Sequence, residues 1–138
     1  MTTMIDTNVL VDLAVRDETW LSWSRTQLLL AMRRGGVVIN QIIYSEFSYR
    51  YDDVDEVEAL LPRAEFVREN LPWNAAFAAA YAFRLYRAAG GRRERTLPDF
   101  FIGAHAAIRG YTLLTRDPAG YRTYFPMVAL ITPETHPL

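Results

Sequence analysis

The sequence predicts an α/β fold, a three-layer α/β/α sandwich with a mainly parallel sheet. Short runs of β-forming residues alternate with longer helical patterns, an order that is typical of βαβ units. The 138 residues are 51% hydrophobic and 22% charged, which suits one soluble domain with a sizeable core. We therefore expect a single domain over residues 1–138.

The first half of the chain predicts two strands separated by a helix. Thr3–Ile5 is an apolar run that indicates the first strand, and Val37–Ile39 indicates the second. Between them, residues 19–34 carry apolar positions at helical spacing and end at Gly35-Gly36, which is a suitable helix stop. Trp20 and Trp23 lie in this helix among apolar residues that spread around it, so we expect burial on two sides.

The second half predicts three more strands and two helices. Residues 65–71 are a weak strand that Pro72 closes, and residues 73–89 are a helix rich in alanine and aromatic residues. Residues 99–109 are a second helix, whose small residues suit close packing on a sheet. The remaining strands are expected at 111–114 and 127–131.

Composition excludes several kinds of protein. The chain has no cysteine, which rules out a disulfide framework and a thiolate zinc site. All fifteen basic residues are arginine, so every mechanism that needs a lysine ammonium is excluded. The formal net charge of -1 argues against a general nucleic-acid coat. Without a long apolar run or a basic region at the amino terminus, the expected location is cytoplasmic.

Four acidic residues stand beside or close to apolar runs, where a packed core does not favour them. They are Asp6, Glu46, Asp99 and Asp117, and none has a basic partner within its own motif apart from the neighbouring Arg116. Carboxyl ends of parallel strands meet at one edge of a sheet, so these acids are able to converge. Such a cluster can bind Mg²⁺ or Mn²⁺, which polarises a phosphate and activates water.

Each acid also has an ordinary structural interpretation when it is taken alone. Asp6 and Asp99 fit helix caps, Glu46 fits a solvated helix residue, and Asp117 fits a turn before Pro118. Their order and flanking residues favour the joint interpretation.

At these residues the sequence resembles a PIN domain, and specifically the VapC family of toxin ribonucleases from toxin-antitoxin pairs. Four segments carry the resemblance, which covers nearly the whole chain: Ile5-Asp6-Thr7-Asn8-Val9-Leu10, Ser45-Glu46-Phe47, Leu97-Pro98-Asp99-Phe100-Phe101-Ile102-Gly103-Ala104-His105-Ala106, and Leu113-Leu114-Thr115-Arg116-Asp117.

The resemblance implies a Mg²⁺-dependent endoribonuclease that hydrolyses RNA phosphodiester bonds with metal-activated water. Asp6, Glu46, Asp99 and Asp117 are then the metal-binding acids, with Asn8 and Thr115 as supporting polar groups. The implied partners are RNA and a VapB-type antitoxin. A PIN-like protein that binds RNA or a partner without cutting is the alternative.

Other site chemistries fit less well. An aspartyl-phosphate site at Asp6 would need a lysine, and a dehalogenase motif would have aspartate where Asn8 stands. The acidic run at 52–58 lacks the central glycine of a calcium loop and is interpreted as a solvated face. His105 is expected to be a packed histidine, and His136 lies in the tail.

Two further expectations concern binding surfaces. Arg92, Arg93 and Arg95, together with Arg116, are candidate RNA phosphate contacts because each stands close to one of the acids. The apolar surplus of helices 19–34 and 73–89 suits a homodimer or an antitoxin segment lying between the two helices.

Overall fold

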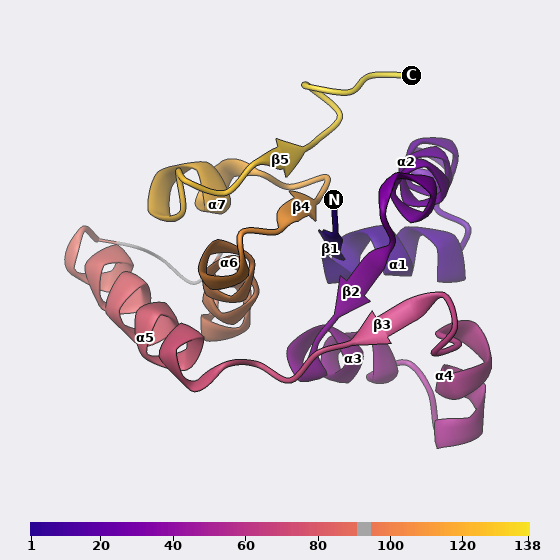
Figure 1. Ribbon diagram of the computed structural model, residues 1–138, viewed down its shortest axis with the longest axis horizontal. Coiled ribbons are helices and arrows are strands. Elements are labelled where there is room, and N and C mark those ends of the chain that lie inside the picture. The colour runs from indigo at the N-terminus through magenta and orange to yellow at the C-terminus, as the bar shows by residue number, and fades with distance from the viewer. Residues whose placement is uncertain (91–94) are drawn as a thin grey trace.

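A five-stranded parallel sheet forms the centre of the computed structural model, which describes residues 1–90 and 95–138 (Figure 1). The strands are β1 (Thr3–Ile5), β2 (Val37–Ile39), β3 (Phe66–Arg68), β4 (Thr112–Leu114) and β5 (Leu130–Ile131). The helices are α1 (Thr7–Ala14), α2 (Leu21–Arg34), α3 (Gln41–Ser48), α4 (Val54–Leu60), α5 (Trp73–Ala88), α6 (Leu97–Arg109) and α7 (Ala119–Tyr124).

The strand order is β3-β2-β1-β4-β5, with every neighbouring pair parallel. Crossover connections between parallel strands are almost always right-handed. Connections that run in opposite directions along the sheet therefore place their helices on opposite faces. Accordingly, α1 to α4 gather on one side of the strands and α5 to α7 on the other (Figure 1). This arrangement confirms the predicted α/β/α sandwich.

The sheet is buried on both faces, which explains why its strands are continuous apolar runs. Every residue of β1, β2 and β4 is buried. Helix α5 packs on α6 and buries Ala75, Ala79 and Ala82, while Gly103 of α6 leaves room for the ring of Phe125. A Cβ at Gly103 would stand 2.5 Å from that ring. The small residue at Gly103 therefore permits close packing, here against Phe125 rather than against a strand of the sheet.

Several predicted boundaries were wrong. The third, fourth and fifth strands are shorter than expected, because hydrogen-bonded pairing covers only two or three residues of each. Helices α1, α4 and α7 were not predicted. Each has only six to eight residues, too few to show a clear apolar period. Helix α4 covers part of the acidic run, and Asp53 caps it by accepting from the Asp55 amide.

Helix α6 begins two residues earlier than predicted. Thr96 is its N-cap, and Pro98 and Asp99 lie in its first turn. The Thr96 hydroxyl caps the Asp99 amide while the Asp99 carboxylate accepts from the Thr96 amide, which is a capping box. This reciprocal pair fixes the helix start and the position of Asp99.

The predicted groove between the helices at 19–34 and 73–89 is not present. Helices α2 and α5 lie toward opposite ends of the molecule (Figure 1). Helix α2 also buries only one side: Trp23 is buried, but Leu29 is 49% exposed. Among the described residues, none of the helices has the length and apolar character needed to cross a membrane.

Candidate functional site

A pocket of about 610 Å³ opens at the carboxyl ends of β1 and β4. After β1 the chain crosses to β2 on one side of it. Strand β4, on the other side of β1, is reached by the connection from β3 at the edge of the sheet. The strand order therefore reverses between β1 and β4. Ligands bind parallel sheets at such points. All four predicted acids line the pocket, namely Asp6, Glu46, Asp99 and Asp117.

Asp6 lies at the base of the pocket and is 6% exposed. It occupies the N-cap position of α1, but its side chain makes no capping hydrogen bond. Instead its Oδ2 accepts hydrogen bonds from Thr115 Oγ1 at 2.8 Å, Tyr121 Oη at 3.0 Å and Asn8 Nδ2 at 3.3 Å. These donors fix the carboxylate, and Oδ1 accepts no hydrogen bond from a described residue. The interpretation of Asp6 as a simple cap is therefore wrong.

Burial raises the pKa of Asp6 from 3.8 to about 6. The hydrogen bonds from Thr115 and Tyr121 lower it, and the charges of Asp99 and Glu46 raise it further. Burial raises the pKa by more than the hydrogen bonds lower it, because a charge taken out of water loses most of its solvation. Asp6 therefore retains a proton for part of the time near neutral pH, which a divalent cation would displace.

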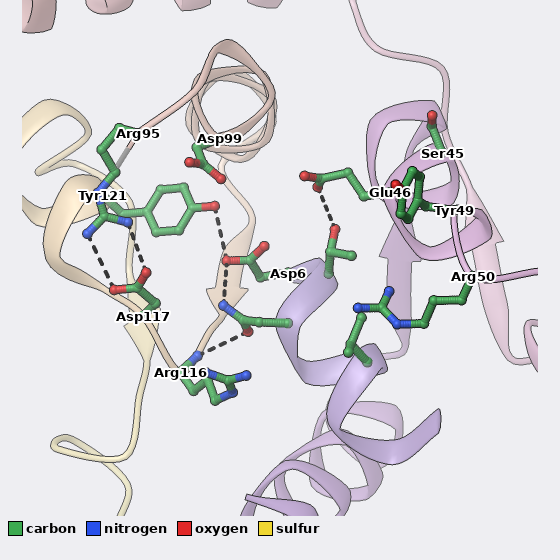
Figure 2. Close-up of a pocket in the computed structure, with 13 residues that line it drawn as sticks. Asp6, Ser45, Glu46, Tyr49, Arg50, Arg95, Asp99, Arg116, Asp117 and Tyr121 are labelled. Carbon is green, nitrogen blue, oxygen red and sulfur yellow. Dashed lines mark hydrogen bonds and ion pairs between the residues drawn. The ribbon is translucent and has the colours of Figure 1, made fainter. Parts of the chain in front are cut away.

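Glu46 and Asp99 face the same space from two other helices (Figure 2). Glu46 lies in α3, a helix that follows the second strand, and its Oε1 accepts from Thr7 Oγ1 at 2.8 Å. Burial raises the pKa of both acids, and the nearby Asp99 raises that of Glu46 further. Glu46 is half-buried and bound to α1, so its interpretation as a freely solvated residue is also wrong.

Asp117 stands apart from the other three acids because it has a strong cationic partner. Arg95 Nη1 and Nη2 donate to its two carboxylate oxygens at 3.0 and 3.3 Å. The guanidinium packs against Gly120, where a Cβ would lie 2.9 Å from Arg95 Nε. This bidentate pair neutralises Asp117 at the edge of the pocket.

The predicted supporting residues contact the acids. Thr115 donates to Asp6 and accepts from the Asp117 amide at 3.0 Å, and Asn8 bridges Asp6 and Thr115. Tyr121 was missed, although its buried hydroxyl donates to Asp6. It lies on α7, which was not predicted, 115 residues from Asp6 in sequence.

The remaining basic candidates differ. Arg116 Nε donates to both oxygens of the buried Asp12 at 3.0 and 2.8 Å, so its charge is already paired. That pairing does not favour its predicted contact with RNA. Asp12 lies within the apolar run Val9–Leu13, and an acid in such a run was a sequence signal for a buried ion pair. Arg92 and Arg93 lie outside the described residues.

The two other predicted features have structural roles. His105 is fully buried, between Asn40 Nδ2 at 2.9 Å and Glu69 Oε1 at 3.1 Å, as expected for a packed histidine. Most of the acidic run at 52–58 is exposed, as expected for a solvated face.

The acids suit a hard divalent cation in chemical type. Carboxylate oxygens are what Mg²⁺ and Mn²⁺ prefer, and three of the four acids carry a raised pKa that such an ion would relieve. Across residues 1–90 and 95–138, however, no three acidic or histidine side chains approach closely enough to form a ready-made metal site. The carboxylates are therefore chemically suited to a divalent metal, but in this conformation they lie too far apart to form a ready-made site.

Comparison with known proteins agrees with the fold. A crystal structure of VapBC2 from Rickettsia felis, bound to a DNA fragment from its promoter, matches with a TM-score of 0.74 at 17% identity. The match covers 96% of this chain and 98% of that chain. DNA-bound VapBC from Salmonella typhimurium matches with a TM-score of 0.71 at 17% identity, over 96% and 98%.

FitAcB from Neisseria gonorrhoeae matches with a TM-score of 0.66 at 20% identity, over 97% of this chain and 99% of that chain. At these identities the likeness concerns the fold alone. No curated protein matches the sequence. The model of the PIN domain family matches residues 3–126, which include all four acids of the pocket. This chain therefore belongs to the PIN domain family.

Proposed function

We propose that the chain is a Mg²⁺-dependent endoribonuclease of the VapC type, the toxin of a toxin-antitoxin pair, and that Mn²⁺ can replace Mg²⁺. The observation that carries this proposal is the environment of the Asp6 carboxylate. Three donors hold its Oδ2, Oδ1 accepts from none of the residues that the structure describes, and burial raises the pKa to about 6. A buried carboxylate aligned in this way, with two more acids facing it, suits cation binding better than packing.

In this proposal Asp6, Glu46 and Asp99 hold the metal, and Asp117 joins them when Arg95 releases it. A bound Mg²⁺ would supply a Lewis acid that polarises the scissile phosphate and lowers the pKa of water. Asn8, Thr115 and Tyr121 keep Asp6 in its orientation. Arg95 lies at the edge of the pocket, and once it releases Asp117 its guanidinium is a candidate for binding an RNA phosphate.

The alternative is a PIN-like protein that binds RNA or a partner without cutting. The Arg95–Asp117 pair favours this alternative, because it occupies one of the four acids. Incubation of a labelled RNA pool with purified protein separates the two functions. Cleavage that requires Mg²⁺, stops with EDTA and is lost in Asp99→Asn supports the enzyme. Binding without cleavage at millimolar Mg²⁺ supports the alternative.

For the partner we propose a VapB-type antitoxin, in the cytoplasm. Three of the solved structures with this fold are described as VapBC complexes. Helix α1 links two suitable surfaces: Val11 lines the acidic pocket, whereas Leu10 and Leu13 line an apolar groove of about 160 Å³. An antitoxin segment with apolar residues and an arginine would fit both. Where a neighbouring reading frame encodes a small protein, its co-expression with this chain should give a complex that leaves RNA intact.

We also propose a homodimer, formed through α5. Its exposed face carries Trp73 and Phe77, which are 92% and 76% exposed, and then Tyr81 and Leu85 at helical spacing. A groove of about 820 Å³ runs beside this row, between α5, α6 and α7. A row and a groove on one face suit self-association about a two-fold axis. Light scattering on the purified chain tests this assembly.

A further inference from the structure

The rim of the acidic pocket opposite Arg95 and Asp117 is formed by the end of α3. Ser45, Tyr49 and Arg50 line the pocket there together with Glu46 (Figure 2). Tyr49 is the C-cap of α3 and is 90% exposed. An aromatic ring this exposed packs against almost nothing in its own chain, which leaves its apolar face available to a ligand.

Arg50 differs from the other described arginines of the pocket. Arg95 is paired with Asp117 and Arg116 with Asp12, so both charges are already compensated. Within the described part of the chain, Arg50 makes neither a hydrogen bond nor an ion pair. Its guanidinium is directed inward from the rim, toward α1 (Figure 2). An uncompensated cation beside a pocket of carboxylates suits an anionic ligand.

The spacing between Arg50 and Glu46 sharpens this contrast. Arg50 follows Glu46 by four positions, which is the spacing at which Glu and Arg pair on a helix surface. Helix α3 ends at Ser48, so Arg50 lies past the last helical turn, and no ion pair joins it to Glu46. Glu46 is instead bound by Thr7. The end of the helix therefore keeps one acid facing the pocket and one arginine free.

We propose that Tyr49 and Arg50 form a subsite for a nucleotide next to the scissile phosphate of a single-stranded RNA. Tyr49 stacks on the base, and Arg50 binds the phosphate of that nucleotide. This inference rests on the proposed ribonuclease function and names its substrate class. Stacking requires an unpaired base, because bases inside a duplex present no free face. Arg50 offsets the repulsion that the acids exert on the RNA backbone.

The test measures binding of two fluorescent probes, an eight-nucleotide oligoadenylate RNA and an abasic phosphodiester chain of the same length. Full-length protein carrying Asp99→Asn serves as the background, so that no probe is cut. Tyr49→Ala should weaken binding of the RNA about tenfold and leave the abasic probe unchanged, whereas Tyr49→Phe should bind like the background. Arg50→Ala should weaken both probes and reduce the salt slope by about 0.7.

Arg25→Ala is the matched control, because Arg25 is an exposed arginine on α2 outside the pocket. Thermal melts establish that each variant is folded. Binding of both probes unchanged in Tyr49→Ala and Arg50→Ala, while the background binds RNA, would overturn the subsite alone. The subsite would also be overturned, and the proposed function left intact, if Arg50→Ala weakened binding of an antitoxin but not of RNA. A wild-type protein that neither binds nor cuts RNA would overturn the proposed function as well.

Discussion

Replacing Asp6 by Asn should stabilise the metal-free protein at neutral pH. Asn retains an oxygen for the donors Thr115, Tyr121 and Asn8, but it carries no charge into the buried site. Burial raises the pKa of Asp6 from 3.8 to about 6, so the ionised carboxylate is disfavoured in the folded state. At about 1.4 kcal/mol for each pKa unit, the penalty at pH 7 is about 3 kcal/mol. Because Asp6 is 6% exposed, solvent screening removes little of this energy.

The sign of the pH dependence follows from proton binding. Between about pH 4 and pH 6 the folded protein holds a proton on Asp6 that the unfolded chain has released. The contribution of Asp6 to wild-type stability therefore falls as pH rises through this window, and the Asp6→Asn variant lacks this fall. The difference should be largest at pH 7 and almost absent at pH 4.

Urea unfolding in EDTA at pH 4, 5, 6 and 7 measures the effect. Asp52→Asn is the control, because Asp52 is exposed and should show little difference from wild type at any pH. Adding Mg²⁺ should stabilise the wild type and not Asp6→Asn. If Asp6→Asn is less stable than wild type at pH 7 in EDTA, or if its advantage does not shrink toward pH 4, the reasoning about burial is wrong.

The remaining predictions concern single side chains of the site and of the proposed dimer. Asp99→Asn should reduce Mg²⁺-dependent RNA cleavage at least about a hundredfold in a gel assay, and Glu46→Gln should reduce it less because Thr7 already shares that carboxylate. Tyr121→Phe removes a hydrogen bond that lowers the Asp6 pKa, so carboxyl NMR should place that pKa higher; an unchanged titration would contradict this. Arg95→Ala frees Asp117, so calorimetry should find Mg²⁺ binding severalfold tighter, and weaker binding would reverse the assigned role. Phe77→Glu should convert a dimer into a folded monomer by light scattering, and an intact dimer would place the interface elsewhere.

The sheet was the most predictable part of the molecule. Buried parallel strands are continuous apolar runs, so Thr3–Ile5 and Val37–Ile39 could be located to the residue. The placement of Asp6 and Asp117 followed from the strands that precede them. Short helices were harder, because α1, α4 and α7 have too few residues for a clear period and depend on tertiary packing.

Contacts between distant side chains were the least predictable. Tyr121 reaches Asp6 across 115 residues, and Arg116 reaches Asp12 across 104. A pattern of neighbours in sequence does not report such pairs. The sequence nevertheless placed the acids in one pocket, because several strand and helix ends have to meet at one edge of the sheet. The sequence could not show that Arg95 forms an ion pair with Asp117.

Calorimetry with Mg²⁺ tests most directly whether these acids form one cation site. The titration is run near pH 6 in two buffers of different ionisation enthalpy, with Asp6→Asn in parallel. We expect binding to wild type with release of part of a proton, because the raised pKa of Asp6 leaves it partly protonated until the cation enters. Binding should be much weaker, and the proton release smaller, in the variant. No binding to wild type at millimolar Mg²⁺, or equal binding to both proteins, would contradict the account.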